Sequence, residues 1–390
     1  MKKIWLPVVT LFILFRISGV ALPPNDKIWD IAPGEKYVWL AYGNGEVRAG
    51  YDLRGALRRY DRQTREWRTF TIQDIFGTDF NARVRAVETD GSSTVWVGLS
   101  PKGSDILPWA CAVSHDNGDT WTSFSTTDGL SSNNVTCIEV DSVTKAIYVG
   151  HYFNIPGSIS RSTNGGVSWS VLSPNDTDGV CAIQARGGTV WAGSYFYDSY
   201  GGGEILFKST NSGDSWEYFD SSDTPSIHNN SDIDDICMVS PSEVHCAFYT
   251  EFSANSSSGG YVYTTDGGAS WNTQDVERYD EYAQSITVDG GGRVWIALRW
   301  ADSHSIYLTD DNGSSWQGFA YPSPLPYVDP FVIRYDSRAD IVWAGFSNPS
   351  FNNFTTGWCW TSDGGVSWHT DPPPAMEFTA ADPAGWNLYQ

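Results

Sequence analysis

Basic residues and methionine are scarce in this sequence of 390 residues. It contains 24 lysines and arginines against 46 aspartates and glutamates, only three methionines, and a formal net charge of −22. A chain this acidic repels nucleic acid and anionic membrane surfaces. The composition therefore argues against a nucleic-acid-binding protein and leaves neutral ligands, cations or basic partners.

Sequence patterns typical of metal centres are also missing. The six histidines are dispersed, and none of the six cysteines forms a CxxC pair. Structural zinc sites draw four such ligands from short, regular spacings. Asp232, Asp234 and Asp235 form an acidic cluster that we interpret as a solvated turn rather than a calcium site. We therefore expect neither a metal nor a cofactor.

Long apolar runs are confined to the N-terminus. Lys2 and Lys3 precede an apolar segment at 4–15, and residues 19–21 end in the small side chains typical of a signal-peptidase site. The run is too short to span a bilayer. Residues 1–21 are predicted to be a cleaved signal peptide, so we expect a secreted, periplasmic or cell-surface protein that does not insert into the membrane.

A sustained apolar period of 3.6 residues is absent after residue 27, which argues against a mainly helical fold. The sequence instead has 19 tryptophans, 20 tyrosines, 18 phenylalanines and 38 glycines. Aromatic residues favour strands, and glycine favours the tight turns between them. The composition predicts an all-β protein with many short strands.

One motif recurs along the chain, with the pattern Ser/Thr-x-Asp/Asn-x-Gly-x-Ser/Thr-Trp. Its six clear copies end at Trp121, Trp169, Trp216, Trp271, Trp316 and Trp368, and a degenerate first copy ends at Trp67. Successive tryptophans are 54, 48, 47, 55, 45 and 52 residues apart. Such a period in an all-β sequence predicts propeller blades of four strands each.

A second apolar motif, typified by Val-Trp-x-Gly, keeps step with the first. Its copies begin at Tyr37, Val95, Ile147, Val190, Val244, Val294 and Val342. Another apolar run and a turn precede each copy, so each repeat contains strands A to D with the first motif as the C–D turn. We predict a seven-bladed β-propeller of four-stranded antiparallel blades at 22–372, followed by a tail or linker at 373–390.

The residue types of the repeated turn have a structural explanation. An Asp or Asn side chain accepts hydrogen bonds from backbone amides further along the turn, and the Ser or Thr hydroxyls bind other backbone groups. Glycine supplies the positive φ of a tight turn. The Trp ring is expected to be buried between adjacent blades. We therefore assign these residues to folding rather than to chemistry.

With these six copies the chain resembles the Asp-box (BNR) repeat proteins, which include sialidases, xyloglucanases, sortilin-type receptors and a photosystem II assembly factor. The resemblance covers roughly 27–372 and implies a propeller with Asp-box turns between strands C and D. Asn164 and Asn211 replace the Asp in two copies. The first blade and residues 127–135 also resemble the periplasmic propellers of two-component sensors.

Two departures argue against the enzymes of this family. The first strand, at 27–33, has no arginine where the sialidases carry an Arg-Ile-Pro motif, and Arg83, Arg85, Arg299 and Arg334 fit no arginine triad. The xyloglucanases pair two seven-bladed propellers around a cleft, whereas this sequence provides one. Both departures favour binding over hydrolysis.

The B–C loops and D–A linkers are predicted to share one face of the propeller and are long and irregular. Variable loops on a rigid scaffold often carry function. Their aromatic side chains suit stacking on a sugar or gripping a peptide, and they equally suit capping the ends of the blades. The candidate ligand-binding residues are Trp109, Tyr152, Phe153, Tyr195, Tyr197, Phe252, Trp300 and Trp358.

A glycoside hydrolase is the alternative, and it needs two carboxylates about 5 Å or roughly 6.5–9.5 Å apart. The candidates near the loop face are Asp30, Asp105, Asp198, Glu251, Asp302 and Asp329. Nothing in the sequence singles out two of them, so no catalytic residue is assigned. We expect a monomeric, exported binding protein for a glycan or for an extended peptide or protein.

Six cysteines in an exported chain predict disulfides. If Pro241 and Ser242 centre a hairpin, Cys237 and Cys246 face each other across it, at a separation that allows a bridge. Cys137 and Cys181 are predicted to lie on neighbouring inner strands, offset by about one position. The other two cysteines, Cys111 and Cys359, are expected to be buried strand thiols.

Overall fold

The computed structural model describes most of the chain between residues 26 and 370. The described ranges are 26–44, 55–101, 105–152, 159–174, 179–194, 205–220, 222–223, 231–253, 256–276, 282–299, 304–320, 329–347 and 357–370. The predicted signal peptide and the predicted tail lie outside them. Within these ranges no helix is long and apolar enough to cross a membrane.

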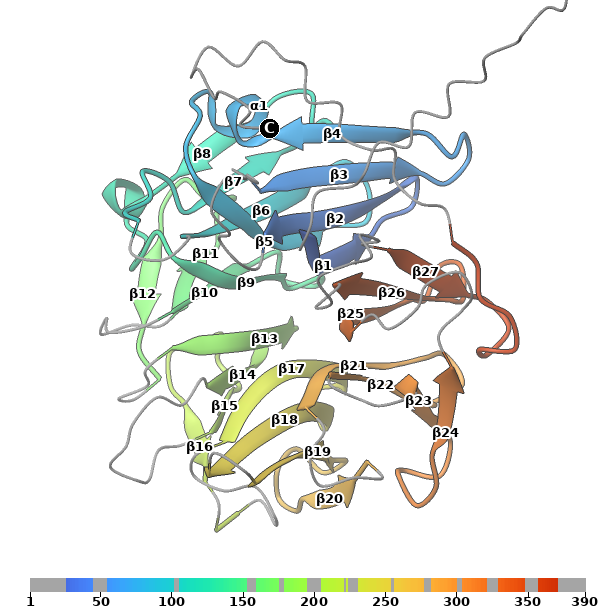
Figure 1. Cartoon of the computed structure of the whole chain (residues 1–390). Coiled ribbons are helices and arrows are strands. Elements are labelled where there is room, and N and C mark those ends of the chain that lie inside the picture. The colour runs from blue at the N-terminus through green and yellow to red at the C-terminus, as the bar shows by residue number, and fades with distance from the viewer. Residues whose placement is uncertain are drawn as a thin grey trace, which may run out of the picture.

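The strands form antiparallel blades arranged radially around a central axis (Figure 1), along which residues of the first strands line a narrow channel. Blade 1 consists of β1 (Asp26–Pro33), β2 (Tyr37–Asn44), β3 (Ala56–Asp61) and β4 (Trp67–Thr71), and blade 2 consists of β5 (Ala82–Thr89), β6 (Val95–Pro101), β7 (Cys111–Ser114) and β8 (Thr122–Phe124). Blade 3 consists of β9 (Val135–Val140), β10 (Ile147–His151), β11 (Ile159–Ser162) and β12 (Ser170–Leu172), and blade 4 consists of β13 (Val180–Arg186), β14 (Thr189–Ser194), β15 (Leu206–Ser209) and β16 (Glu217–Phe219).

The remaining blades follow the same order. Blade 5 consists of β17 (Ser231–Ser240), β18 (Glu243–Ser253), β19 (Ser256–Thr264) and β20 (Asn272–Asp275), and blade 6 consists of β21 (Tyr282–Val288), β22 (Val294–Arg299), β23 (His304–Thr309) and β24 (Gln317–Ala320). Blade 7 consists of β25 (Asp329–Asp336), β26 (Ile341–Ser347) and β27 (Trp358–Thr361). In blade 7 a single β-bridge between Trp360 and His369 stands where the fourth strand would be. The predicted seven-bladed propeller with four-stranded antiparallel blades is confirmed.

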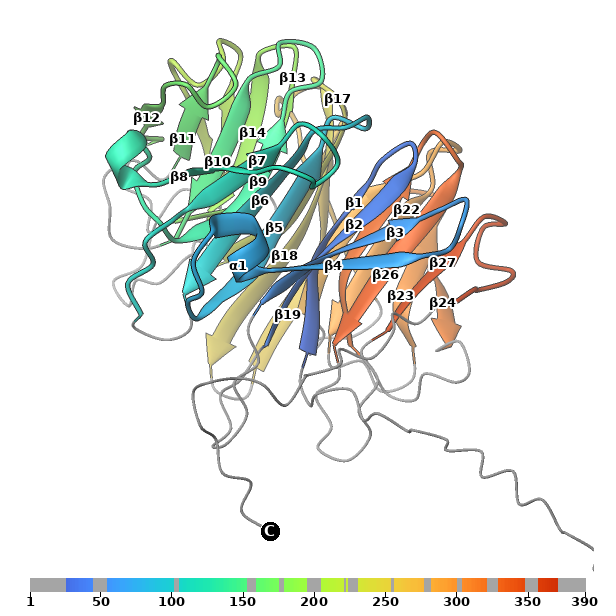
Figure 2. The ribbon, with the colours of Figure 1, turned by 90° about the horizontal axis from the view of Figure 1, so that it is seen from above.

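The ring is closed by contacts between first strands. Each first strand packs against the first strands of both neighbouring blades, and β1 packs against β25 as well as β5. A single pairing, Lys27 with Ser347, also joins β1 to β26. The two ends of the propeller domain therefore meet, and the seven first strands surround the channel. Figure 2 shows these strands running from one face of the ring to the other.

Two short helical segments lie between blades. The helix α1 (Ile72–Phe76) follows β4 and begins with a capping box at Thr71, while a 3-10 turn at Thr126–Asp128 follows β8. Ile72, Ile75 and Phe76 are buried between blades 1 and 2.

The repeated turns share one hydrogen-bond pattern. In the second blade Ser114 Oγ accepts the Gly118 amide at 2.8 Å, and Asp116 accepts both the amide and the hydroxyl of Thr120 at 2.8 and 2.6 Å. Asn164 likewise accepts the Ser168 amide, but its own side-chain amide donates to the Ser168 hydroxyl. Gly118 has a φ of 89°, and a Cβ there would lie 2.7 Å from the Phe70 ring of the preceding blade. Glycine is therefore required both by the turn and by the packing of blade on blade.

The tryptophans that end the turns seal the blades against one another. Trp169 of blade 3 packs edge-on against Trp96 and Phe124 of blade 2, with ring centroids 6.1 and 5.9 Å apart. Trp271 meets Trp191 and Phe219 of blade 4 in the same arrangement, and Trp368 meets Trp295 and Phe319 of blade 6. The predicted packing of these rings between blades is confirmed for these interfaces, with Trp271 buried and Trp169 and Trp368 partly buried.

The predicted disulfide between Cys237 and Cys246 is wrong, because all six cysteines are free. The hairpin does turn at Pro241 and Ser242, since Ser240 pairs with Glu243, but a bulge at Val239 shifts the register by one. Cys246 consequently pairs with Ile236 instead of Cys237. A one-residue shift sends the two thiols to opposite faces of the blade. Cys246 packs toward blade 4 and Cys237 toward blade 6.

Candidate functional site

Each of the seven first strands contains a β-bulge at an equivalent position. The register against the second strand skips one residue in every blade, and a bulge turns that extra side chain toward the channel. The skipped residues are Trp29, Arg85, Thr136, Cys181, Asp234, Gln284 and Phe331. All seven line one cavity on the propeller axis.

The cavity has a volume of about 80 Å³. Deeper in the channel, it is also lined by four polar side chains that lie three residues after a bulge, namely Glu88, Glu139, Gln184 and Arg334. The lining carries five carboxylates and two arginines. A space of this size accommodates a few water molecules. It lies well below the roughly 300 Å³ at which ligand pockets begin, so a ligand larger than water has to lie at its mouth.

Arg334 is the central contact of the channel. Its guanidinium donates to Asp235 Oδ2 at 2.6 Å, to Ser285 Oγ at 3.0 Å and to Asp30 Oδ1 at 3.2 Å. These partners come from blades 5, 6 and 1, whereas Arg334 belongs to blade 7. Burial by itself lowers the pKa of Arg334, but the negative charges of Asp235 and Asp30 outweigh it and raise the pKa above its usual value. One side chain thereby ties four blades together.

Two other carboxyls of the channel favour their protonated forms. Burial raises the pKa of Glu88 to about 8 and the pKa of Glu139 well above its usual value, and Glu88 adds to the latter shift by repulsion. Glu139 Oε2 accepts from Gln184 at 3.0 Å, and its other oxygen accepts the Ala185 amide. The channel therefore holds less negative charge at neutral pH than its composition indicates.

Asp232, Asp234 and Asp235 do not form the solvated turn expected from the sequence. They lie within β17, where the bulge at Asp234 directs both Asp234 and Asp235 into the channel lining. Asp234 Oδ1 accepts from the Tyr282 hydroxyl at 2.9 Å, while its Oδ2 is buried without a partner among the described residues. Burial raises the pKa of Asp234 well above its usual value, and neighbouring Asp232 adds to the shift.

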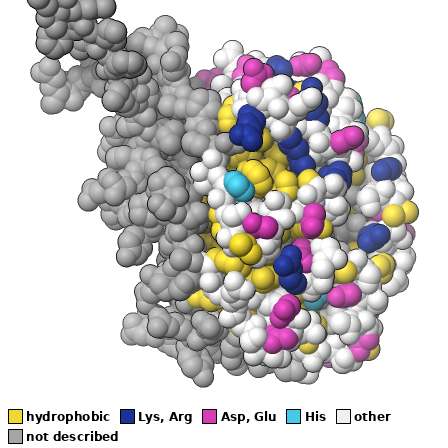
Figure 3. Space-filling view, turned by 90° about the vertical axis from the view of Figure 1, so that its right-hand side faces the viewer, with side chains coloured by type: hydrophobic (Ala, Val, Ile, Leu, Met, Phe, Trp, Pro, Cys, Tyr) yellow, Lys and Arg dark blue, Asp and Glu magenta, His cyan; other side chains and the backbone are white. Residues whose placement is uncertain are grey.

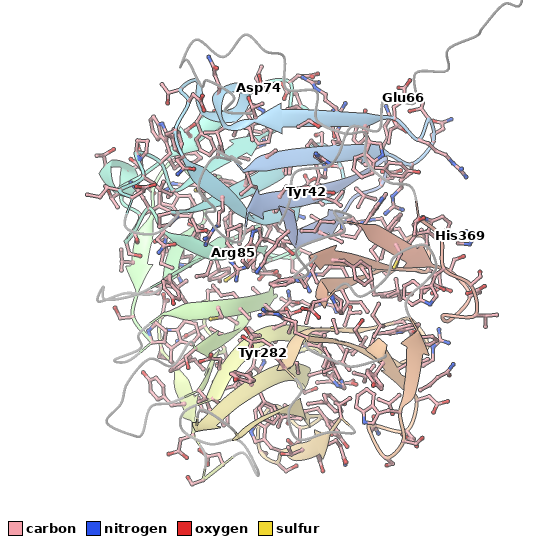
Figure 4. All side chains as sticks on the ribbon, viewed as in Figure 1. Tyr42, Glu66, Asp74, Arg85, Tyr282 and His369 are labelled. Carbon is pink, nitrogen blue, oxygen red and sulfur yellow. The ribbon has the colours of Figure 1, made fainter. Side chains whose placement is uncertain are left out.

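Cationic and aromatic side chains gather at the channel end where the first strands begin. We call this set the mouth crescent; it consists of Lys27, Trp29, Arg83, Arg85, Tyr282, Arg299 and Phe331. It spans blades 6, 7, 1 and 2. Arg85 and Tyr282, labelled in Figure 4, lie on first strands that border the channel. The outer wall in Figure 3 instead mixes cationic, acidic and hydrophobic side chains.

The structure separates the predicted ligand-binding aromatics into three groups. Trp358 is fully buried and stacks on Trp343 at 4.7 Å, so this prediction is wrong for the conformation observed. Trp109 is half-buried against the core between blades 1 and 2, and Tyr152 is half-buried beside β13. Phe252 lies in β18, but its side chain is not described. The remaining candidates, Phe153, Tyr195, Tyr197 and Trp300, lie outside the described residues.

The candidate catalytic carboxylates are similarly dispersed. Asp30 lies in the channel beneath Arg334, Asp329 is buried at the start of β25, and Asp105 is exposed and accepts from Asn81. Asp198 and Asp302 lie outside the described residues, and the side chain of Glu251 is not described. No group of three or more His, Cys, Asp or Glu side chains in the described ranges is arranged to hold a metal.

The sequence does contain a signal for the bulges that our sequence analysis missed. In the first strands, buried positions are three residues apart, as in Ile28 and Ile31 or Ile233 and Ile236. Strict alternation in a half-buried strand requires a spacing of two. The two residues between such a pair both face the channel, so a spacing of three, repeated once per blade, identifies the channel lining.

The fold and the axial channel together define a seven-bladed β-propeller with a polar centre. No protein-family model and no curated protein matches the sequence. Among solved structures, a streptogramin B lyase is 15% identical, with a TM-score of 0.55 over 83% of this chain and 91% of that one. A catalytically inactive virginiamycin B lyase from Staphylococcus aureus with quinupristin is 15% identical, with a TM-score of 0.54 over 78% and 86%.

A GH74 enzyme from Niastella koreensis is also similar. It is 14% identical, with a TM-score of 0.52, and the alignment covers 88% of this chain and 65% of the enzyme. This chain thus spans about two thirds of the enzyme's length. At these identities the similarities show the propeller fold alone.

Proposed function

We propose that this protein is an exported binding propeller that holds a glycan at the mouth of its channel. The observation that carries the proposal is the mouth crescent, a group of donors and aromatic rings on the rigid ends of four neighbouring blades. Sites on rigid strands keep their side chains in place better than sites on loops. The polar channel lining behind the crescent supplies both donors and acceptors, which suits a ligand rich in hydroxyl groups.

Three further arguments support export and binding over other roles. The predicted signal peptide, the acidic composition and the aromatic B–C loops all suit a protein that meets its ligand outside the cytoplasm. An extended peptide would use the same donors, and it is the other ligand that a binding experiment has to include. In the sequence, the candidate loop residues Tyr195 and Tyr197 come shortly after β14, and Trp300 comes directly after β22, which ends at Arg299 of the crescent.

Binding is tested by probing a glycan array and a peptide library with the full mature chain. We expect glycans to be retained, and retention to fall when Tyr195, Tyr197 and Trp300 are all replaced by alanine. Tyr218→Ala is the matched control, because Tyr218 is an exposed aromatic residue on the outer strand β16. If only peptides are retained, the ligand is a peptide and not a glycan. If neither glycans nor peptides are retained, the proposal is rejected.

Glycoside hydrolysis is the second candidate function, and one observation favours it. Glu88, with a pKa of about 8, stays protonated near neutral pH, as a general acid must. The cavity of about 80 Å³ around it is too small for a sugar ring to enter beside it. We therefore expect no release of reducing ends from polysaccharides. Release that Glu88→Gln abolishes would establish the enzyme instead.

A further inference from the structure

The aromatic rings of the mouth crescent are occupied by cations. Lys27 Nζ lies 4.4 Å from the centroid of Phe331, the guanidinium carbon of Arg299 lies 4.5 Å from the same ring, and that of Arg85 lies 4.2 Å from Trp29. Trp29 and Phe331 also pack edge-on at 5.4 Å. A ring face covered by a cation is not open to a sugar, so these rings serve to orient the cations.

Arg85 is the member of the crescent whose donors are available. Its guanidinium lines the cavity and forms no hydrogen bond or ion pair with any other described residue. An arginine has five N–H donors in a planar fork. Arg334, deeper in the channel, shows the contrasting case, with its donors taken by Asp235, Ser285, Asp30 and a backbone carbonyl. Arg85 is thus held in place by a ring while its hydrogen-bonding capacity stays unused.

Four cationic side chains gather at the mouth of this acidic protein. Arg83, Arg85, Arg299 and Lys27 meet there, although the protein carries a net charge of −22. Asp234 is the carboxyl beside Arg85 and Arg299, and burial raises its pKa well above the usual value, which reduces its power to cancel them. Asp232 and Asp329, two other described carboxylates at these strand ends, also take part in interactions.

We infer that the mouth crescent is an anion site and that the glycan it receives is acidic, carrying a carboxylate or a sulfate on its sugar. This inference rests on the proposed function and narrows its ligand class. Arginine binds carboxylate and sulfate oxygens through paired N–H donors, and such charge-assisted bonds are about twice as strong as neutral ones. Arg85 supplies the fork, while Arg299 and Lys27 supply the surrounding positive charge.

The inference is tested with matched pairs of glycans that differ in charge alone. Binding of oligogalacturonate is compared with binding of its carboxyl-reduced, neutral counterpart, and dextran sulfate is compared with dextran. Poly-glutamate serves as an acidic probe that is not a sugar. The first pair reports on the carboxylate and the second on the sulfate, so the two sources of the anion are distinguished.

We expect at least one acidic glycan to bind roughly tenfold more tightly than its neutral counterpart, and expect its binding to weaken as sodium chloride rises from about 50 to about 500 mM. Arg85→Met, which keeps the aliphatic stem, should abolish most of this preference, and Arg85→Lys should restore part of it. Arg68→Met is the matched control, because Arg68 lies half-exposed on β4 with Asp119 as its partner. Thermal unfolding of each variant confirms that the ring is intact.

The outcomes separate this inference from the proposed function. Equal binding of charged and neutral glycans, or unchanged binding by Arg85→Met, overturns the acidic ligand while leaving glycan binding in place. If poly-glutamate binds tightly and no glycan binds, both the acidic glycan and the proposed glycan binding are overturned, and the ligand is an acidic peptide. The absence of binding to every probe, together with an empty glycan array, also rejects both.

Discussion

Arg334 donates a hydrogen bond of 2.6 Å to Asp235, although their strands β25 and β17 belong to blades that are separated by blade 6. Ser285 of that intervening blade donates to the same carboxylate oxygen at 2.5 Å and also accepts from Arg334. The arginine reaches Asp30 of blade 1 as well. The propeller is therefore held together at its centre by polar contacts, in addition to the apolar packing between blades.

Replacing Arg334 by leucine should lower the free energy of unfolding by about 3 kcal/mol, because Asp30 and Asp235 would lose their shared partner inside the channel. Urea-induced unfolding followed by tryptophan fluorescence measures this change. Arg334→Lys keeps the charge but loses the fork, and should fall between the wild type and the leucine variant. Equal stability of all three proteins would show that channel water replaces the guanidinium.

Glu88 should make stability depend on pH in the alkaline direction. Its pKa is about 8 in the folded protein and near 4.5 when unfolded, so the folded state binds the extra proton between these values. Stability is therefore lost as the pH rises from about 4.5 to about 8. Glu88→Gln removes this titration, and we expect it to be more stable than the wild type at pH 9, relative to pH 5, by on the order of 2 kcal/mol.

Glu139→Gln is the control for that experiment, because Glu88 and Glu139 repel each other in their charged forms. Repulsion from the charged Glu88 helps to keep Glu139 protonated while Glu88 ionises, so Glu139→Gln should leave the loss of stability that Glu88 causes up to about pH 8 in place. Parallel stability curves for the wild type and Glu88→Gln between pH 5 and 9 would contradict the assignment.

The repeated turns should contribute stability that is lost in acid. The hydroxyl and amide of Ser270 hold the pKa of Asp266 at about 2, so its contribution is present above the unfolded value near 3.9 and disappears as the pH falls toward 2. Asp266→Ala should lower the thermal midpoint at neutral pH by about 2 °C. Asp266→Asn should stay close to the wild type, since Asn164 and Asn211 form the same turn.

Trp169 should contribute more to the stability of the fold than its half-exposed position indicates. Trp169→Ala removes the ring that meets Trp96 and Phe124 of the preceding blade, and should cost about 3 kcal/mol. Trp169→Phe should recover part of this loss. The adjacent exposed residue Val167 provides the control, since Val167→Ala should change stability by less than about 0.5 kcal/mol. Calorimetric unfolding of the three variants measures their order of stability.

Peptide mapping under non-reducing conditions should find no disulfide between Cys237 and Cys246. The two thiols face opposite sides of blade 5, and Cys246 is fully buried. We expect Cys246 to react with iodoacetamide only after unfolding. Recovery of a linked peptide pair from the native protein would show that the bulge at Val239 is absent and that the hairpin has the simple register.

Much of the propeller was predictable because its information is local and repeated. Six turns contain their own Asp or Asn, Gly and Trp, the first turn keeps the Asp and the Trp, and each second strand has a similar apolar motif, so seven copies define seven blades. The position of the hairpin at Pro241 and Ser242 was predicted on the same basis. The disulfide prediction failed because of the bulge at Val239. This one extra residue changes which residues pair across the hairpin.

The candidate site was less accessible to prediction. Trp358 was predicted among the loop aromatics, but it is a core residue stacked on Trp343. The acidic cluster at Asp234 was interpreted as a turn because three carboxylates fall within four residues and the partners of Asp234 are distant in sequence. Tyr282 and Gln284, which contact Asp234, come from the next blade.

The sequence by itself determined the class of fold, the number of blades and the chemistry of the turns, since each depends on residues within a few positions of one another. Only the tertiary structure decided which side chains face the channel and which of them are paired. Arg334 and Asp30 are separated by 304 residues, and they meet because the ring closes between blades 7 and 1. The availability of Arg85 has the same origin, since it depends on bulges in strands from every blade of the ring.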